Sequence, residues 1–298
     1  MSVFDRVCPS PACKDLFASS NSDLSGVQSH RLYDRGSGPK SDLEATMEEI
    51  LNALEDEAPF VEYWSRAAWQ NLDAHRDVDE AHAKTLPPVP EWGEPAPTCS
   101  KDDFRFPVNG HVLYLDVEGE EVGLGRGGTC VFGEGWSDVT VVPPREGRLL
   151  RFPGDAMHSV PRGPLSYFDE EHGGTNHLIY TRKRNDKERR GVVLFNTWQE
   201  SPTGDWDGND NGNEGEEKGR RSFASAFKEW EGVDVIDGVD DGAELRMKVA
   251  LLGDRRRREG VMGRYRELVA KGSEVIKLFN GGDGSDFIPR TFGVSIAE

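Results

Sequence analysis

The middle of the chain, from about residue 108 to residue 198, alternates short apolar runs with turns that contain Gly or Pro. The runs are HVLYLDV, GGTCVF, DVTVVPP, GRLLRFPG and GVVLFNTW. Runs of this length, rich in Val, Leu and Phe and bounded by turn residues, are typical of β-strands. They do not alternate with helical patterns, so the sequence predicts an antiparallel sandwich or barrel.

A helical pattern precedes these runs. In SDLEATMEEILNALEDEA, which begins at Ser41, Met47, Ile50 and Leu51 fall on one helical face. Ser41 is suited to be the N-cap, with Glu44 three residues later as its capping-box partner. The segment VEYWSRAAWQNLDAH that follows alternates and is rich in aromatic residues, which predicts one or two strands. The predicted fold class is therefore mainly β with flanking helices.

Composition divides the chain into four parts. Residues 1–40 are rich in Ser, Gly, Pro and Asp, and we expect them to be disordered. Residues 41–200 would form the β domain with its N-terminal helix, and the acidic, Gly-rich residues 201–221 a flexible linker. Residues 222–298 would be an extension that packs on the core or extends it, with a helix around YRELVAKG.

The formal net charge of −18 limits the classes of partner. Binding to nucleic acid or to an anionic membrane needs basic surface, so we expect neither partner. No apolar run approaches the ~20 residues that span a bilayer, and the first residues lack the apolar core of a signal peptide. The four cysteines form no CxxC pair. A reducing intracellular compartment, the cytoplasm in the simplest interpretation, is therefore expected.

The tripeptide His75-Arg76-Asp77 is the first candidate for chemistry. Composition alone predicts roughly 1.3 His residues with an acidic residue two places later, so one such pair carries little weight by itself. On a strand, however, residues i and i+2 point to the same side, so His75 and Asp77 would converge. An imidazole and a carboxylate are two ligands of the 2-His-1-carboxylate triad of non-haem Fe(II) oxygenases.

A second histidine is needed, and His158 is the best candidate because it lies where an apolar segment, GRLLRFPGDAM, meets a loop. His172 and His177 are rivals, but they lie in a stretch that contains Gly173 and Gly174 and would form a poorly preorganised site. His111, at the start of a strand, is expected to be structural.

The order of these motifs resembles a known family. HRD, VLYLDVEG with GGTCVF, VVPPREGRLLRFPGDAMHSV and RRGVVLFNTW follow one another as in the Fe(II)/2-oxoglutarate-dependent dioxygenases, most closely in the prolyl 4-hydroxylase-like branch. The resemblance covers roughly residues 60 to 200. It implies a double-stranded β-helix (jelly-roll) core, with Fe(II), 2-oxoglutarate and O₂ as cofactor and co-substrates and ascorbate as an accessory reductant.

Residue by residue, the resemblance implies that His75, Asp77 and His158 bind iron and that Arg190 binds the far carboxylate of 2-oxoglutarate. Arg189 is a rival for this anchor, displaced by one residue; Arg190 is favoured because Val192, Leu194 and Asn196 then share its face. Thr129 lies where the family often contacts the co-substrate. The chain departs from the family in the long gap of 32 residues between His158 and Arg190, which contains an insertion at residues 164–188, and in an Arg where prolyl hydroxylases use Lys.

The resemblance implies hydroxylation of an unactivated C–H bond, with a peptidyl proline as the leading substrate and a protein, peptide or small molecule as partner. The alternatives are the same chemistry on a small molecule and a non-catalytic β-helix binding module whose iron site has decayed.

Overall fold

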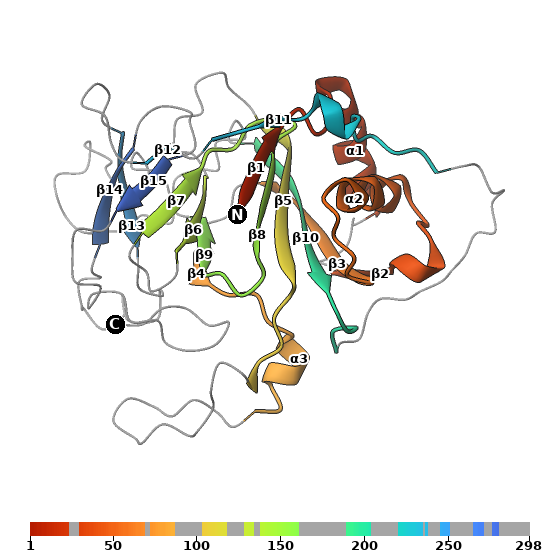
Figure 1. Cartoon of the computed structure of the whole chain (residues 1–298), viewed down its shortest axis with the longest axis horizontal. Coiled ribbons are helices and arrows are strands. Elements are labelled where there is room, and N and C mark those ends of the chain that lie inside the picture. Colours follow the sequence, from red (N-terminus) through yellow and green to blue (C-terminus); the bar gives the residue numbers. More distant parts are fainter. Residues whose placement is uncertain are drawn as a thin grey trace.

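A computed structural model describes much of the 298-residue chain. The described residues are 1–23, 30–68, 72–86, 103–117, 128–133, 138–160, 189–203, 220–234, 236–237, 245–250, 265–270 and 276–279. Two β-sheets form its centre, and two helices cover the outer side of the first sheet (Figure 1).

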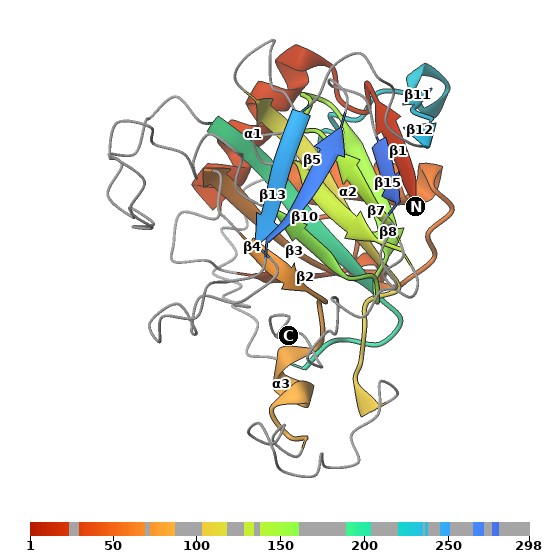
Figure 2. The same cartoon turned by 90° about the vertical axis from the view of Figure 1, so that its left-hand side faces the viewer.

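The first sheet has seven strands and the second has six. In spatial order, the first contains β11 (Glu231–Gly232), β1 (Ser2–Asp5), β8 (Leu149–Pro153), β5 (Asn109–Val117), β10 (Arg189–Trp198), β3 (Phe60–Ala68) and β2 (Arg31–Asp34). The second contains β12 (Ile236–Asp237), β15 (Ile276–Phe279), β7 (Asp138–Val142), β6 (Thr129–Phe132), β9 (His158–Val160) and β4 (Leu72–His75). In Figure 2 the strands are seen along their length, with the two sheets overlapping in the view.

The strand order of the two sheets defines the fold. The central strands of the first sheet run β8-β5-β10-β3 and those of the second run β7-β6-β9-β4, and every pairing among them is antiparallel. The chain therefore passes repeatedly from one sheet to the other, as a double-stranded β-helix requires. The predicted fold class, mainly β with a double-stranded β-helix core and flanking helices, is confirmed.

The helices cover the outer face of the first sheet. α1 (Ser10–Asp23) and α2 (Asp42–Ala53) pack on it through one buried apolar cluster, and Figure 1 shows both on the side away from the second sheet. Ser41 caps α2 as predicted, because its hydroxyl accepts a hydrogen bond from the Glu44 backbone N–H at 3.1 Å. The other helical segments within the described ranges are short: η1 (Arg35–Ser37), α3 (Glu80–Ala83) and η6 (Phe227–Glu229).

The prediction that residues 1–40 are disordered is wrong. Residues 1–23 and 30–40, which the structure describes, contain β1, the whole of α1 and β2, and the side chains of Val3, Val7, Cys13 and Leu16 are buried. The N-terminal strand is held by long-range pairing, with Val3 opposite Leu150 of β8. The described N-terminal segments therefore contribute to the core.

The expected helix around YRELVAKG is also wrong. This segment forms β14 (Tyr265–Ala270), which pairs with β13 (Leu245–Ala250) in a separate two-stranded sheet. Elsewhere in the C-terminal segment, β11 pairs with β1 and β15 pairs with β7, which adds strands to both main sheets.

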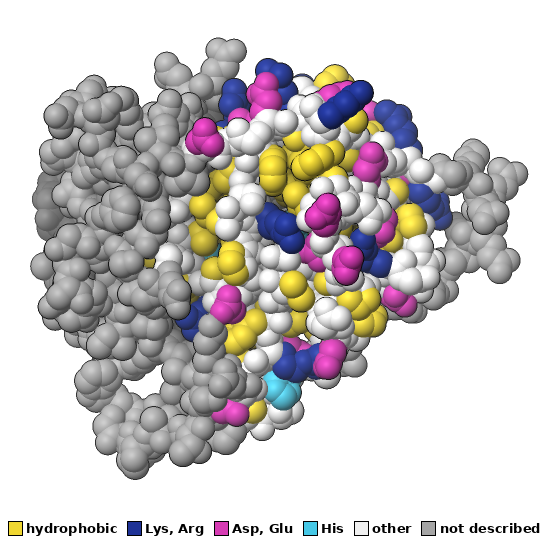
Figure 3. Space-filling view, viewed as in Figure 1, with side chains coloured by type: hydrophobic (Ala, Val, Ile, Leu, Met, Phe, Trp, Pro, Cys, Tyr) yellow, Lys and Arg dark blue, Asp and Glu magenta, His cyan; other side chains and the backbone are white. Residues whose placement is uncertain are grey.

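The face of the molecule seen in Figure 1 carries side chains of mixed character in its described part. Figure 3 shows basic and acidic side chains interspersed with apolar ones over the described half of that face. Among the described residues, no helix is both long enough and apolar enough to cross a membrane.

Candidate metal centre

Strand pairing brings the two candidate histidines together. β4 ends at His75 and β9 begins at His158, and these two residues lie directly opposite each other in the antiparallel β4–β9 pair. Side chains at opposite positions share a face of the sheet and lie close to each other. Here the two imidazole rings have centroids 4.4 Å apart at an interplanar angle of 54°.

Asp77 completes a three-residue cluster. Its Oδ1 lies 3.6 Å from His75 Nε2 and its Oδ2 lies 3.7 Å from His158 Nε2. The three potential ligand atoms all lie within 4.8 Å of one another. His75 and Asp77 therefore converge, although Asp77 lies beyond the end of the strand rather than on it.

The nitrogen–oxygen separations suit a shared ion. They exceed the normal length of a direct hydrogen bond. Two ligands that each lie about 2.1 Å from one ion are separated from each other by roughly 3 to 3.5 Å. The two nitrogen–oxygen separations in the cluster are thus slightly longer than those expected around a bound ion.

The environment prepares the ligand atoms for a cation. The Nδ1 of His158 lies 3.2 Å from the Ala156 carbonyl oxygen. When Nδ1–H donates to that oxygen, the Nε2 lone pair is left facing Asp77. Asn196 Nδ2 donates to Asp77 Oδ2 at 3.1 Å, which fixes the orientation of the carboxylate.

The same surroundings favour the ionised carboxylate. Burial raises the pKa of Asp77, but the positive charges that His158 and His75 can carry, together with the Asn196 hydrogen bond, outweigh it and leave the pKa below the usual value. The Asp77 and His75 side chains are 21% and 24% exposed, whereas His158 is 8% exposed. The cluster therefore opens to solvent on one side and is closed behind His158.

A basic residue lies deeper between the sheets. Arg190 of β10 is 4% exposed, and its Nη2 donates to Thr129 Oγ1 on β6 at 3.2 Å. Tyr114 of β5 contacts both residues, because its hydroxyl lies 2.7 Å from Thr129 Oγ1 and its ring centroid lies 5.3 Å from the Arg190 guanidinium carbon. The inward orientation expected for Arg190 is observed, while the side chain of Arg189 lies outside the described residues.

The register of β6 and β9 relates this group to the histidines. Val131 pairs with His158, and Thr129 lies two residues earlier on the same face of β6. Two residues along a strand correspond to about 7 Å. Thr129, which contacts Arg190, therefore lies on the same face of the second sheet as His158 and about two residues along β6 from the residue paired with it.

Among the described residues, the other histidines do not join the cluster. His111 is buried on the opposite face of the first sheet, stacked on Phe195 with ring centroids 4.5 Å apart, in agreement with a structural role. His82 lies in α3, where its Nε2 is 3.0 Å from the Asp103 carbonyl oxygen. His172 and His177 lie outside the described residues, as do the whole insertion at residues 164–188 and residues 204–219 of the predicted linker.

Sequence reasoning missed three residues around this centre. Tyr114, Asn196 and Asp79 contact the candidate site residues or the segment that carries them. The alternation in VLYLDV places Tyr114 on the same face as Val112, which was a usable indication. The bonds of Asn196 to Asp77 and of Asp79 to Thr203 join residues 119 and 124 positions apart, and no local pattern indicates these two contacts.

Comparison with known proteins gives weak likenesses only. No protein-family model and no curated protein matches the sequence. Among solved structures, the chain is similar to a Pseudomonas putida prolyl-4-hydroxylase, with 14% identity, a TM-score of 0.37 and coverage of 65% of this chain and 84% of that one. It is also similar to HygX from Streptomyces hygroscopicus with nickel and 2-oxoglutarate bound, with 13% identity, a TM-score of 0.35 and coverage of 65% and 80%. The assignment of the fold rests on the strand order described above.

Proposed function

We propose that the protein is an Fe(II)- and 2-oxoglutarate-dependent dioxygenase. The observation that carries this proposal is the convergence of His75, Asp77 and His158 between the sheets of a double-stranded β-helix. Two imidazoles and one carboxylate on one side of an ion leave the opposite side open for co-substrates, which is the arrangement of non-haem Fe(II) oxygenases.

The residues of the chain have separate tasks in this proposal. His75, Asp77 and His158 hold the metal, and Asn196 keeps the carboxylate of Asp77 turned toward it. Arg190 pairs with the distal carboxylate of 2-oxoglutarate, because its planar fork of N–H donors matches a carboxylate. The bound iron, 2-oxoglutarate and oxygen supply the oxidising chemistry, and the protein supplies orientation and charge.

The position of the anchor also keeps water away from the co-substrate. Arg190, Thr129 and Tyr114 are all buried between the sheets, where an ion pair with a carboxylate is stronger than in water. Thr129 and Tyr114 hold one another through a 2.7 Å hydrogen bond, so the wall behind the guanidinium is fixed before the co-substrate arrives.

The reaction proposed is hydroxylation of an unactivated C–H bond. A peptidyl proline is the first substrate class to test, because the sequence resembles the prolyl 4-hydroxylase-like branch. A small molecule is the alternative substrate class, and ascorbate is expected to support turnover by keeping the iron reduced.

The proposal is tested by 2-oxoglutarate turnover. Purified protein with Fe(II) and ascorbate is expected to release succinate slowly without added substrate. His75→Ala and Asp77→Ala should abolish that release, whereas Arg190→Ala should require a far higher 2-oxoglutarate concentration. His82→Gln is the matched control, because His82 lies on the same stretch of chain but outside the cluster.

Two results would contradict the proposal. Equal succinate release by wild type and Asp77→Ala would show that the turnover is not due to this site. A wild-type protein that neither retains iron nor releases succinate would favour a non-catalytic binding module built on the same fold.

A further inference from the structure

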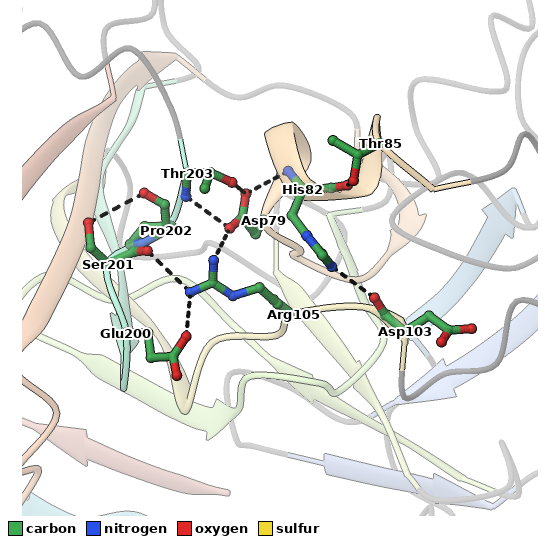
Figure 4. Close-up of polar contacts among 9 residues, drawn as sticks. All are labelled: Asp79, His82, Thr85, Asp103, Arg105, Glu200, Ser201, Pro202 and Thr203. Atoms are coloured by element: carbon green, nitrogen blue, oxygen red, sulfur yellow. Dashed lines mark hydrogen bonds and ion pairs between the residues drawn. The ribbon is translucent and has the colours of Figure 1, made fainter.

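A buried carboxylate lies two residues beyond Asp77 and takes no direct part in the proposed reaction. The side chain of Asp79 is 0% exposed, and Asp79 precedes the four-residue helix α3. Figure 4 shows that its carboxylate points toward Arg105 and Thr203. Such a group is stable only when several donors surround it.

Asp79 is surrounded by donors from three segments of the chain. Its Oδ1 accepts hydrogen bonds from Thr203 Oγ1 at 2.6 Å and from the His82 backbone N–H at 3.0 Å. Its Oδ2 accepts from the Thr203 backbone N–H at 2.9 Å and from Arg105 Nη1 at 3.0 Å. These bonds join the segment after β4, the segment before β5 and the segment after β10 (Figure 4).

Arg105 extends the connection on its other side. Its Nη2 donates to Glu200 Oε2 and to the Ser201 carbonyl oxygen, both at 3.2 Å. The backbone N–H of Asp79 in turn donates to the Arg105 carbonyl oxygen at 2.9 Å. Asp79 and Arg105 are therefore joined twice, once through their side chains and once through the backbone.

The hydrogen bonds of Asp79 and Arg105 affect the position of Asp77, because Asp77 is not on a strand. β4 ends at His75, so no ladder hydrogen bonds fix the backbone of residues 76–79. The β4–β9 pairing fixes one end of this short segment, and Asp79 fixes the other end to Thr203. Thr203 lies five residues beyond the end of β10, the strand that carries Arg190 and Asn196.

Helix capping alone does not account for Asp79. A cap requires only the bond from the His82 N–H, and Ser, Thr or Asn at this position would make it equally well. The two bonds from Thr203 and the ion pair with Arg105 are tertiary contacts. They connect Asp79 to residues 124 and 26 positions away.

We propose that Asp79 is a positioning residue for the metal centre, which sets metal affinity by tying the segment of His75 and Asp77 to the end of β10 through Thr203 and Arg105. The inference rests on the proposed metal site. In this proposal, β10 and the residues that follow it have three roles. They supply Arg190 as the co-substrate anchor, Asn196 as the amide that orients Asp77, and Thr203 as the hydrogen-bond donor to Asp79.

The test measures metal binding without turnover. Co(II) is titrated into the full-length apoprotein, and its visible absorption gives both the dissociation constant and the ligand geometry. Asp79→Ala is expected to raise the dissociation constant about 10- to 100-fold, the usual effect of losing a group that orients a metal ligand, and to alter the spectrum. Asp79→Asn, which keeps one acceptor oxygen, should recover part of the affinity.

Asp56→Ala is the matched control. Asp56 is also a buried carboxylate with several donors, including Asn109 Nδ2 at 2.8 Å and Thr197 Oγ1 at 3.1 Å, but it lies on no segment that carries a metal ligand. The Asp56→Ala variant should have a lower melting temperature, as Asp79→Ala should, while its dissociation constant for Co(II) stays within about twofold of the wild-type value.

If Asp79→Ala fails to fold, Thr203→Val takes its place, since it removes the 2.6 Å bond and keeps the carboxylate. Its dissociation constant should rise several-fold, whereas Glu200→Gln, on the exposed side of Arg105, should leave it unchanged. A folded Asp79→Ala or Thr203→Val variant with the wild-type dissociation constant and spectrum overturns the inference alone. Wild-type protein that binds no Co(II) overturns the proposed function and the inference together.

Discussion

The two faces of the first sheet differ although the same strands form both. On the outer face, Leu113, Leu115, Val193 and Phe195 join the apolar cluster under α1 and α2. The side chains that alternate with these along the strands point to the inner face, and several of them are polar. The polar contacts there are Tyr114 with Thr129, Arg190 with Thr129, and Asn196 with Asp77.

This difference shows how one strand serves stability and chemistry at once. In β10, Phe195 points into the core under the helices, and its neighbour Asn196 points to Asp77 of the candidate metal site. Because side chains alternate along a strand, the packing of the outer face fixes the register that orients the inner face. A change on one face should therefore affect stability, and a change on the other should affect metal binding.

The largest effect on stability is expected from Phe195→Ala. Phe195 is fully buried, and removing its ring should lower the free energy of unfolding by about 3 to 5 kcal/mol, measured by urea denaturation. The dissociation constant for Co(II) of the folded variant should stay within about twofold of wild type. A large loss of metal affinity in a folded Phe195→Ala protein would show that the two faces are not separable.

His111 is a buried polar residue on the outer face, and it gives a pH-dependent prediction. Burial lowers the pKa of His111 to about 4; the negative charge of Asp56 opposes this shift, and the positive charge of Arg151 adds to it. The pKa in the folded protein is therefore below the unfolded value of about 6.5. The unfolded chain binds a proton first, so stability should fall as the pH drops from about 6.5 to 4, by on the order of 3 kcal/mol.

Urea denaturation of wild type and His111→Leu across this pH range checks the prediction. The variant lacks the titrating group, so its stability should fall less between pH 6.5 and 4, by the amount assigned to His111. The Co(II) affinity at neutral pH should not change, because His111 lies on the outer face. Parallel pH profiles of the two proteins would contradict the assignment.

The sequence predicted the parts of the fold whose pattern is local. A few neighbouring residues are enough to indicate each of these features: the core strands, the helix capped by Ser41 and the HRD tripeptide. The N-terminal strands do not: β1 and β2 have four residues each and are held by partners far away, with Val3 opposite Leu150 and Tyr33 opposite Val61. In YRELVAKG, helix-forming residues are used in a strand because pairing with β13 outweighs their intrinsic preference.

The candidate site follows the same division. His75, Asp77 and His158 were found because the residue types and their order resemble a family, and the β4–β9 pairing brings them together. The roles of Asn196 and Asp79 could not be found in this way, because Asn196 bonds to Asp77 and Asp79 bonds to Thr203 across 119 and 124 positions of the sequence. Sequence patterns indicate which residues can bind a metal, whereas the tertiary fold decides which residues orient them.

Asn196→Ala gives the smallest and most specific effect. Losing the 3.1 Å hydrogen bond to Asp77 should raise the Co(II) dissociation constant about tenfold, or about 1.4 kcal/mol, because the carboxylate is then free to rotate away from the ion. Leu194→Ala is the control, since Leu194 lies two residues earlier on the same face and is packed among apolar side chains. Equal changes in metal affinity for the two variants would indicate that cavity formation, not the hydrogen bond, causes the effect. A change for Asn196→Ala alone, set beside a Phe195→Ala protein that is less stable but binds metal normally, would assign adjacent residues of β10 to separate tasks.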